Sequence, residues 1–486
     1  ADHPREQRRE TIVLDLAAGD AIGIVGSARS GRTTTLVSLA IAAAARLSPD
    51  DCAMYLLDGG SGELHAIAAL PHVASCASWR DADHLARLVL RLAAEVAGRR
   101  SRQHRSDAFR AVADDSSARV AALLVVIDGW ETCARVLDDH DGGESSAALL
   151  GLIRAGPSAG VTVVVSGDRE LLAVRLAGSL TTRYALRLAD RSDYALVGVA
   201  PAEVDTIMPP GRAVRGSDAT SVQFAHAGSS SGLDAARDAA ARITAPSGRP
   251  TRQSRRRVVV QALPRQLRLA ELPLQDDRFV LGLGGDAADP MSIDLSGARA
   301  RFVVGGPPGS GRTSVVRLVL HQAVRAGVPA VLFAPAHSPA YEDARRRGMP
   351  AVTPSDAAAA IPHGARLLLV DDPETFAATD VESALLALLT GGCALLVATS
   401  STDLAVAHRG IVAEARKTRS GLLLSPRPAD GEPFGVRLPR RNAEVIPGRG
   451  VLLCVGRDPV PIQVALPDDL TTYVGTGDPS AGRTSP

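Results

Sequence analysis

The sequence has a single lysine, Lys417, so nearly all of its 54 basic residues are arginines. Acidic and basic residues almost balance, and the formal net charge of +1 gives no positive field that points to nucleic acid. Aromatic residues make up only 3% of the chain, which leaves few rings for stacking on unpaired bases. These shortages count against a protein that binds single-stranded nucleic acid.

Paired cysteines and long apolar runs are also missing. The cysteines are scattered with no C-x-x-C spacing, which indicates reduced, buried thiols and neither a disulfide framework nor a zinc site. No apolar run approaches the ~20 residues that cross a bilayer, and the sequence shows no signal peptide. We therefore expect a cytoplasmic protein. Because residue 1 is alanine, we also expect a fragment of a longer chain, at the cytoplasmic face of the membrane if that chain is anchored upstream.

An internal repeat organises the 486 residues, which are too many for one hydrophobic core. The stretch IVLDLAAGDAIGIVGSARSGRTTTLVSLA, residues 12–40, aligns with MSIDLSGARARFVVGGPPGSGRTSVVRLVL, residues 291–320, once one residue is inserted. Near the end of each copy, Pro210-Gly211-Arg212 matches Pro447-Gly448-Arg449. Two matched blocks in the same order indicate a tandem duplication.

Short apolar runs alternate with longer helical stretches in both copies, which predicts an α/β fold with a mostly parallel sheet flanked by helices. Continuous Val, Leu and Ile runs are typical of strands covered on both faces. A helix over Thr33–Ala45 should start on a glycine loop. The predicted strands are Ala21–Val25, Ala53–Leu57, Ala122–Ile127 and Val161–Ser166 in the first copy, and Arg301–Val304, Ala330–Phe333, Arg366–Val370 and Ala394–Ala398 in the second.

The predicted domains are residues 1–225 and 258–468. Residues 226–257 should form a linker with one alanine-rich helix, and residues 469–486 a disordered tail. Arg255–Arg257 could bind phosphate or could belong to a solvated linker, and the second interpretation is the more common one for a short basic run.

Each copy carries a near match to the phosphate-binding loop G-x-x-x-x-G-K-[ST], with arginine in place of the lysine. Such a loop works because glycines let backbone N–H groups converge on phosphate oxygens at a helix N-terminus. An unliganded glycine-rich turn is the alternative, which the second copy of the motif makes weaker. The candidate nucleotide-binding residues are Gly26, Ser27, Ala28, Arg29, Ser30, Gly31, Arg32 and Thr33, and Gly306, Pro307, Pro308, Gly309, Ser310, Gly311, Arg312 and Thr313.

Residues that could hold Mg²⁺ follow from the same pattern. Thr33 and Thr313 stand where a hydroxyl joins the magnesium shell, and Asp128 and Asp371 end buried strands, where a carboxylate holds the ion. Asp372 is a candidate for orienting the attacking water. The first copy has Gly129 at that place, and Glu131 is not expected to replace it.

Ser166 and Thr399 end the next strand in each copy and are candidates for sensing the γ-phosphate, or are ordinary strand-end caps. Arg154, Arg169 and Arg183 are candidate arginine fingers for a neighbouring site.

Arginine is a poor substitute for the loop lysine in catalysis. Its guanidinium keeps the charge but is planar, longer and bidentate, and small misplacements cost ~10²-fold in rate. We expect both loops to bind ATP, with no useful turnover in the first and slow turnover at best in the second.

The ordered set of motifs resembles a tandem of FtsK/SpoIIIE-type P-loop domains, over roughly residues 10 to 468. It is similar in particular to the C-terminal pair of ATPase domains in the membrane-anchored motor of type VII secretion systems. Besides the loops, YLLDGGSGELHAIAALPHV, residues 55–73, and the MPPGRAV and IPGRGV stretches carry the resemblance.

This resemblance implies two RecA-like domains with Mg-ATP, neighbouring ATPase domains of the same or identical chains as partners, and a small helical secreted substrate engaged through its C-terminal signal. The chain departs from DNA pumps, because it lacks the loop lysine, an Asp-Glu pair in the first copy and a C-terminal winged helix. A double-stranded DNA translocase and a nucleotide-free docking scaffold are the two alternative functions.

Overall fold

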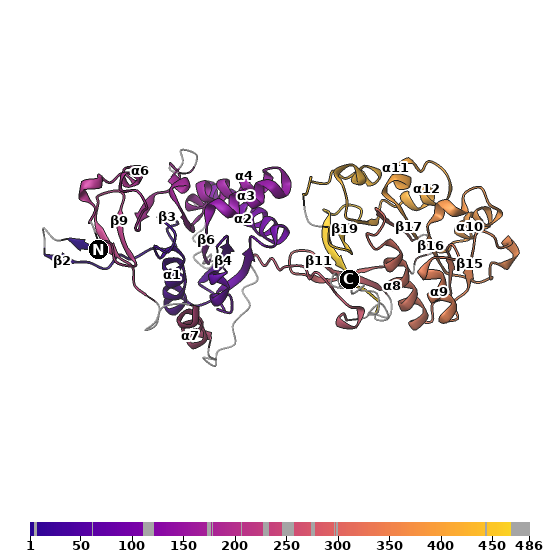
Figure 1. Cartoon of the computed structure of the whole chain (residues 1–486). Helices are drawn as coiled ribbons and strands as arrows, with labels where there is room; N and C mark the ends of the chain where they lie inside the picture. The colour runs from indigo at the N-terminus through magenta and orange to yellow at the C-terminus, as the bar shows by residue number, and fades with distance from the viewer. Residues whose placement is uncertain are drawn as a thin grey trace, which may run out of the picture. The chain divides into compact units, whose positions relative to one another are not determined.

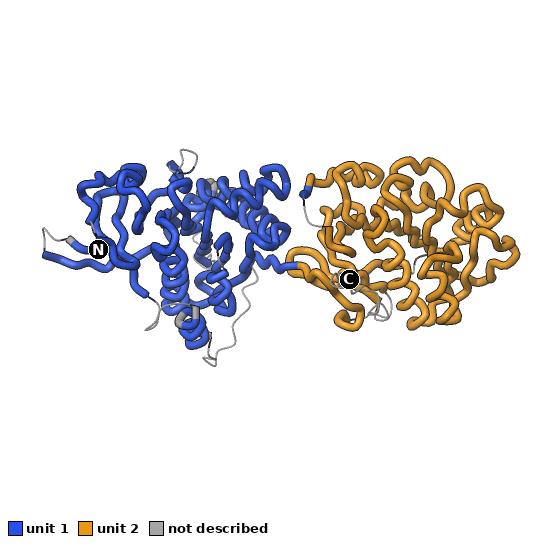
Figure 2. Tube along the Cα trace, in the orientation of Figure 1, with its two compact units in different colours: residues 1–262, 441–443 blue, residues 263–440, 444–486 orange. Residues whose placement is uncertain are grey.

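The computed structural model describes residues 1–467 except 4–6, 61, 110–120, 173–175, 177, 206, 227–232, 245–256, 274–277, 296, 298–299 and 443–444. The predicted disordered tail and most of the predicted linker lie outside the described residues. The chain divides into two compact units (Figure 2). Unit 1 comprises residues 1–262 with 441–443, and unit 2 comprises residues 263–440 with 444–486.

The sheet of unit 1 has the strand order β2-β1-β10-β9-β8-β3-β7-β6-β4-β5. Strands from β8 to β5 in this order run parallel, whereas β9, β10, β1 and β2 extend the sheet antiparallel to their neighbours. The strands are β1 (Asp2–His3), β2 (Arg8–Arg9), β3 (Ala21–Val25), β4 (Cys52–Asp58), β5 (Val73–Ser78), β6 (Ala122–Asp128), β7 (Val161–Gly167), β8 (Thr182–Ala185), β9 (Arg212–Arg215) and β10 (Ser221–Gln223).

The sheet of unit 2 repeats this plan, in the order β12-β11-β20-β19-β18-β13-β17-β16-β14-β15. The parallel part again runs from β18 to β15, and the antiparallel extension again lies on the far side of β18. The strands are β11 (Phe279–Gly284), β12 (Asp289–Ile293), β13 (Arg301–Gly306), β14 (Ala330–Phe333), β15 (Ala351–Val352), β16 (Leu367–Asp371), β17 (Ala394–Ser400), β18 (Gly421–Leu424), β19 (Arg449–Leu453) and β20 (Val460–Val464).

Helices cover both faces of each sheet, which explains the continuous apolar runs of the parallel strands. In unit 1, α1 and α7 lie on one face, and α2, α3 and α4 gather on the other (Figure 1). In unit 2, α8 and α9 share one face, and α10, α11 and α12 pack on the other. The helices are α1 (Arg32–Arg46), α2 (Ala82–Phe109), α3 (Trp130–Asp141), α4 (Glu144–Ala155), α6 (Tyr194–Val197), α7 (Leu233–Thr244), α8 (Arg312–Arg325), α9 (Pro339–Arg346), α10 (Asp380–Thr390), α11 (Ser401–Val406) and α12 (Gly410–Arg416).

The predicted fold class is confirmed, and each predicted strand coincides with an observed one to within two residues. The helix expected after the first glycine loop is α1. The sequence did not reveal the antiparallel extension of either sheet, because strands such as β1, β2 and β10 are only two or three residues long and carry no clear alternation.

Two further expectations concern thiols and membranes. All five cysteines are free, with Cys52, Cys133 and Cys393 buried and Cys76 and Cys454 partly exposed. Within the described part of the chain, no helix combines the length and the apolar character that a membrane crossing needs.

Candidate nucleotide-binding sites

The first glycine loop joins the end of β3 to the first residue of α1, Arg32. Gly31 has φ +103°, in the left-handed region that favours glycine. A Cβ atom on Gly26 would lie 2.3 Å from Ser30 Oγ. Backbone conformation therefore favours glycine at position 31, and close packing against the Ser30 side chain favours it at position 26.

The second loop has the same geometry between β13 and α8. Gly311 has φ +105°, and a Cβ atom on Gly306 would lie 2.5 Å from Ser310 Oγ. Both loops place the first N–H groups of a helix of 14 or 15 residues beside a glycine-rich turn. Such a helix N-terminus, with its positive dipole end, favours an anion.

The two Pro-Gly-Arg stretches, which in the sequence served only to align the two copies of the repeat, lie next to the glycine loops. The Gly448 N–H group donates to the carbonyl oxygen of Ser310 at 3.1 Å. In unit 1, the nitrogen of Gly211 lies 3.7 Å from where a Cβ atom on Gly31 would stand. A side-chain hydrogen bond from the arginine stabilises the Pro-Gly-Arg stretch in both units. Arg449 Nε donates to Gln463 Oε1 at 2.9 Å, and Arg212 Nε donates to Gln223 Oε1 at 3.2 Å.

Asp128, at the end of β6, faces the first loop. Thr33 Oγ1 donates to its Oδ2 at 2.9 Å, and Ser166 Oγ donates to its Oδ1 at 2.5 Å. Burial raises the pKa of Asp128 above its ordinary value, although the bonds from Ser166 and Thr33 act in the opposite direction. The structure thus brings together three predicted site residues from separate elements.

Asp371 holds the matching place at the end of β16. Thr313 Oγ1 donates to its Oδ1 at 3.3 Å, and burial again raises the pKa of the carboxyl. Its Oδ2 accepts a bond of 2.7 Å from Ser338, the N-cap of α9, which sequence reasoning did not single out. Thr399 Oγ1 is buried without a hydrogen-bond partner among the described residues, so it does not repeat the contact of Ser166.

The residue after each strand-end aspartate has left-handed backbone in both units, with φ +68° at Gly129 and φ +50° at Asp372. Asp372 Oδ1 lies 3.5 Å from Arg312 Nη2. Glu131 does not contact the first loop's arginine or threonine; its Oε1 accepts a 2.6 Å bond from the N–H group of Asp168.

The two loop arginines fit a phosphate. Arg32 Nη1 and Arg312 Nη1 are each buried with no hydrogen-bond partner in the described structure. A buried, unpaired guanidinium nitrogen is costly, and a phosphate oxygen would satisfy it. No cluster of three or more His, Cys, Asp or Glu side chains that could hold a metal occurs among the described residues. Mg²⁺ in nucleotide sites takes one or two carboxylate or hydroxyl groups with phosphate and water, which Thr33 with Asp128 and Thr313 with Asp371 can supply.

Comparisons with known proteins agree with this geometry. The model of the FtsK/SpoIIIE family matches residues 1–230. Fold and loops define unit 1 as a P-loop domain of that family, and unit 2 repeats its topology. The chain is 26% identical over 343 residues to the ESX secretion system protein EccC of Thermomonospora curvata, covering 65% of this chain and 25% of the relative. It is 31% identical over 201 residues to ESX-1 secretion system protein EccCb1 of Mycobacterium tuberculosis, covering 39% of this chain and 33% of the relative.

Solved structures show the same two-unit fold. ATPases 2 and 3 of Thermomonospora curvata EccC, in complex with a signal sequence peptide, match 96% of this chain and 91% of theirs with a TM-score of 0.58 and 22% identity. ATPases 2 and 3 of EssC from Geobacillus thermodenitrificans match 96% of this chain and 95% of theirs with a TM-score of 0.66 and 18% identity. The resemblance stated from the sequence is confirmed: residues 1–230 match the FtsK/SpoIIIE family model, and the chain is similar to EccC and EssC proteins. The matched part spans about a quarter to a third of the length of these two secretion proteins.

Proposed function

We propose that the chain is a nucleotide-binding, substrate-engaging module of a type VII secretion motor at the cytoplasmic face of the membrane, with slow or absent hydrolysis. The observation that carries the proposal is the unpaired Nη1 of Arg32 and of Arg312, buried at the start of a helix on a glycine loop. Nucleotide phosphates are the ligands that these groups fit, and each loop would bind one ATP with Mg²⁺. Bound ATP would supply the phosphate oxygens that complete the magnesium shell.

Slow turnover follows from the side chains that are present. Transfer of a phosphoryl group depends on a point charge placed between the β- and γ-phosphates, and a forked guanidinium does not reproduce that placement. Unit 1 also has no carboxylate directly after Asp128, because Gly129 occupies that position. These loops are therefore better suited to binding nucleotide and to regulation than to hydrolysing ATP.

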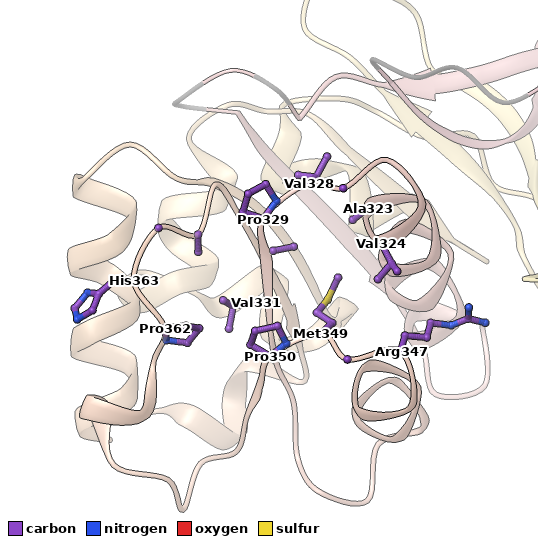
Figure 3. Close-up of a pocket in the computed structure, with 15 residues that line it drawn as sticks. Ala323, Val324, Val328, Pro329, Val331, Arg347, Met349, Pro350, Pro362 and His363 are labelled. Carbon is purple, nitrogen blue, oxygen red and sulfur yellow. The ribbon is translucent and has the colours of Figure 1, made fainter.

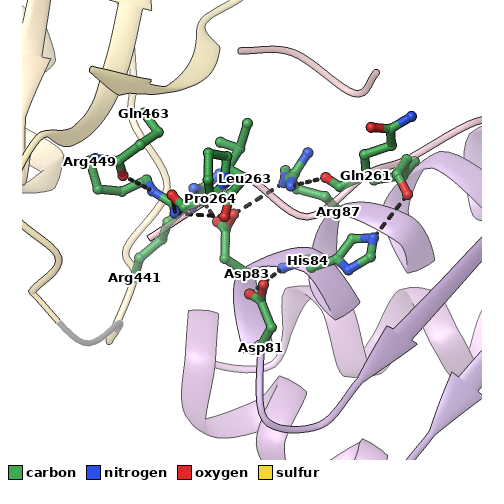
Figure 4. Close-up of polar contacts among 11 residues, drawn as sticks. Asp81, Asp83, His84, Arg87, Gln261, Leu263, Pro264, Arg441, Arg449 and Gln463 are labelled. Atoms are coloured by element: carbon green, nitrogen blue, oxygen red, sulfur yellow. Dashed lines mark hydrogen bonds and ion pairs between the residues drawn. The ribbon is translucent and has the colours of Figure 1, made fainter. Parts of the chain in front are cut away.

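A segment of unit 1 covers one edge of its own sheet. The N–H group of Val258 donates to Tyr55 Oη at 3.1 Å, and Ser75 Oγ exchanges two bonds of 2.8 Å with the N–H and carbonyl groups of Val260. His84 Nε2 lies 2.9 Å from the same carbonyl oxygen, and Arg87 donates to the carbonyl of Gln261 at 2.7 Å (Figure 4).

Arg257 extends the same segment to the start of β4. It donates to the carbonyl oxygen of Pro71 at 2.9 Å, and its charge acts on the thiol of Cys52. Unit 1 thus holds an extended peptide, residues 257–261, across Tyr55, Ser75 and Pro71.

The matching edge of unit 2 carries a cavity. When Asp128 at the end of β6 is matched with Asp371 at the end of β16, the strand register places Val331 where unit 1 has Tyr55, and Pro350 where it has Ser75. Apolar groups thus replace both hydroxyls. A cavity of about 330 Å³ lies at the start of β14, lined among others by Val324, Val331, Met349 and Pro350 (Figure 3). Val331 and Pro350 both line this cavity, so it lies at the place that residues 257–261 cover in unit 1.

We assign this cavity to the C-terminal signal of a small helical secreted substrate. Its apolar lining suits the hydrophobic side chains of a short peptide. The Thermomonospora curvata relative, whose structure holds a signal sequence peptide, supports the choice of occupant.

The first test is the nucleotide released when the purified chain is denatured. Intact ATP in an amount close to the number of loops is the expected result, because binding without cleavage leaves the triphosphate whole. No released nucleotide, together with no uptake from millimolar Mg-ATP, would overturn the proposal and favour a docking scaffold. Hydrolysis stimulated by duplex DNA and falling steeply with salt would instead favour a DNA translocase.

A further inference from the structure

The second loop contains an ion pair that has no counterpart in the first. Arg312 Nη2 lies 3.5 Å from Asp372 Oδ1, and the two side chains are only 15% and 32% exposed. Arg312 is the first residue of α8, and Asp372 directly follows β16. The pair therefore joins the phosphate loop to the strand end that carries Asp371.

The equivalent place in unit 1 cannot form this pair. Gly129 has no side chain, and Arg32 makes no ion pair with any residue described in unit 1. Both positions have left-handed backbone, φ +68° and φ +50°, so glycine is favoured at either one and aspartate is among the residues that tolerate it. At the position after the strand-end aspartate, the two units thus differ by one carboxylate on a similar left-handed backbone.

Further acidic groups surround Arg312. Asp371 is buried beside it, and Glu374 is close enough for Asp372 and Arg312 to act on its carboxyl, whose pKa burial raises. A carboxylate held against the loop arginine neutralises part of the charge that would attract phosphate, and a bound phosphate would in turn be repelled by it.

We propose that Asp372 is a latch on Arg312 that lowers the affinity of the second loop for nucleotide, most strongly for triphosphate. The inference rests on the proposed function and adds a regulatory difference between the loops. A phosphate that enters the second loop must displace the carboxylate from Arg312, whereas a phosphate that enters the first loop meets an arginine that makes no ion pair with the described residues of unit 1. The first loop therefore fills at lower nucleotide concentration.

The test measures binding of Mg-ATP and Mg-ADP by titration calorimetry to the full chain, in an Arg32→Ala background that weakens the first loop. Asp372→Asn removes the charge and keeps a residue that tolerates left-handed backbone; Asp372→Gly copies unit 1. Both should bind Mg-ATP about three- to tenfold more tightly than the parent, with a smaller gain for Mg-ADP. The gain should shrink as salt is raised, because salt screens a partly exposed pair.

Two controls separate the latch from general effects. Asp458→Asn removes one negative charge from the exposed turn between β19 and β20, at the end of β19 away from Arg449, and should leave affinity unchanged. Gly129→Asp in an Arg312→Ala background introduces the carboxylate into unit 1 and should weaken Mg-ATP binding there by a similar factor.

The outcomes distinguish the latch from the function on which it rests. Unchanged or weaker Mg-ATP binding in Asp372→Asn, in a parent that binds nucleotide, would overturn the latch alone. Loss of hydrolysis without a change in affinity would mean that Asp372 orients water. If neither the parent nor Asp372→Asn binds nucleotide, the proposed function fails and the latch fails with it.

Discussion

Thr33 Oγ1 donates a 2.9 Å hydrogen bond to Oδ2 of Asp128, which joins the first turn of α1 to the end of β6. The same relationship recurs between Thr313 and Asp371 at 3.3 Å. In each unit, a hydroxyl and a carboxylate that are far apart in the sequence meet beside a glycine loop. This pairing is what makes a magnesium site possible there.

Thr33→Val should weaken magnesium-dependent ATP binding at the first loop by about tenfold, because it deletes the hydroxyl that pairs with Asp128 and keeps the side-chain shape. Calorimetry with and without Mg²⁺, in an Arg312→Ala background, measures the effect. Thr34→Val changes an exposed neighbour and is the control. Equal effects of the two variants would contradict the assignment of Thr33.

Arg312→Lys should raise the rate of ATP hydrolysis by ~10-fold or more, since lysine restores a compact charge and cannot hold Asp372 as a planar fork does. Arg32→Lys should give a smaller increase, because unit 1 has Gly129 in place of a second carboxylate. Steady-state phosphate release measures both. Rapid hydrolysis by the unmodified chain, abolished by Arg312→Ala, would show that arginine already supports turnover.

Val324→Glu should weaken binding of a signal peptide by about tenfold, because it puts a charge in the lining of an apolar cavity. Val324 is 37% exposed, so the variant should fold. Fluorescence anisotropy can use the signal sequence peptide of the Thermomonospora curvata complex as the probe. Val406→Glu, at a valine that is 63% exposed elsewhere in unit 2, should bind like the parent. Unchanged binding by Val324→Glu would place the peptide elsewhere.

Arg449→Met should destabilise unit 2 by about 1–3 kcal/mol in urea unfolding. Arg449 donates to buried Gln463, and its Nη2 also donates to the carbonyl oxygens of Leu263 and Pro264 at 3.1 and 3.0 Å (Figure 4). Arg212→Met is the matched control in unit 1, where the partners Gln223 and Ser221 are less buried. The loss should be smaller there, and equal losses would mean that the carbonyl contacts contribute nothing.

Glu131 should give unit 1 a pH-dependent stability. Burial raises the pKa of Glu131 from its ordinary value near 4.5 to about 7, so the folded state binds the proton more tightly than the unfolded state. The free energy of unfolding should therefore fall as pH rises from about 4.5 to about 7. Glu131→Gln removes this dependence, and thermal unfolding should show a larger advantage of this variant over the parent at pH 8 than at pH 5. Glu144→Gln, at an exposed residue of α4, should leave the dependence in place.

Much of the fold could be predicted because parallel strands that are buried on both faces appear in the sequence as continuous apolar runs. The runs before Gly26 and Gly306 and those that end on Asp128 and Asp371 each became a strand. The main residues of the candidate site could be proposed from the sequence, since a phosphate loop must have glycines at fixed spacing and a carboxylate at a neighbouring strand end. Antiparallel strands such as β1, β2 and β10 could not, because they are only two or three residues long and are stabilised by pairing with neighbouring strands.

The sequence by itself determined that two copies of one plan stand in tandem, each with a glycine loop that carries arginine, because glycine spacing and apolar periodicity are sufficient for that inference. Only the tertiary structure decided which side chains meet. In the folded chain, Asp372 forms an ion pair with Arg312, and Ser338 donates a hydrogen bond to Asp371. The segment 257–261 lies across the sheet edge of unit 1. These contacts join residues from separate elements, so their hydrogen bonds and charges depend on strand order and burial, which no local pattern contains.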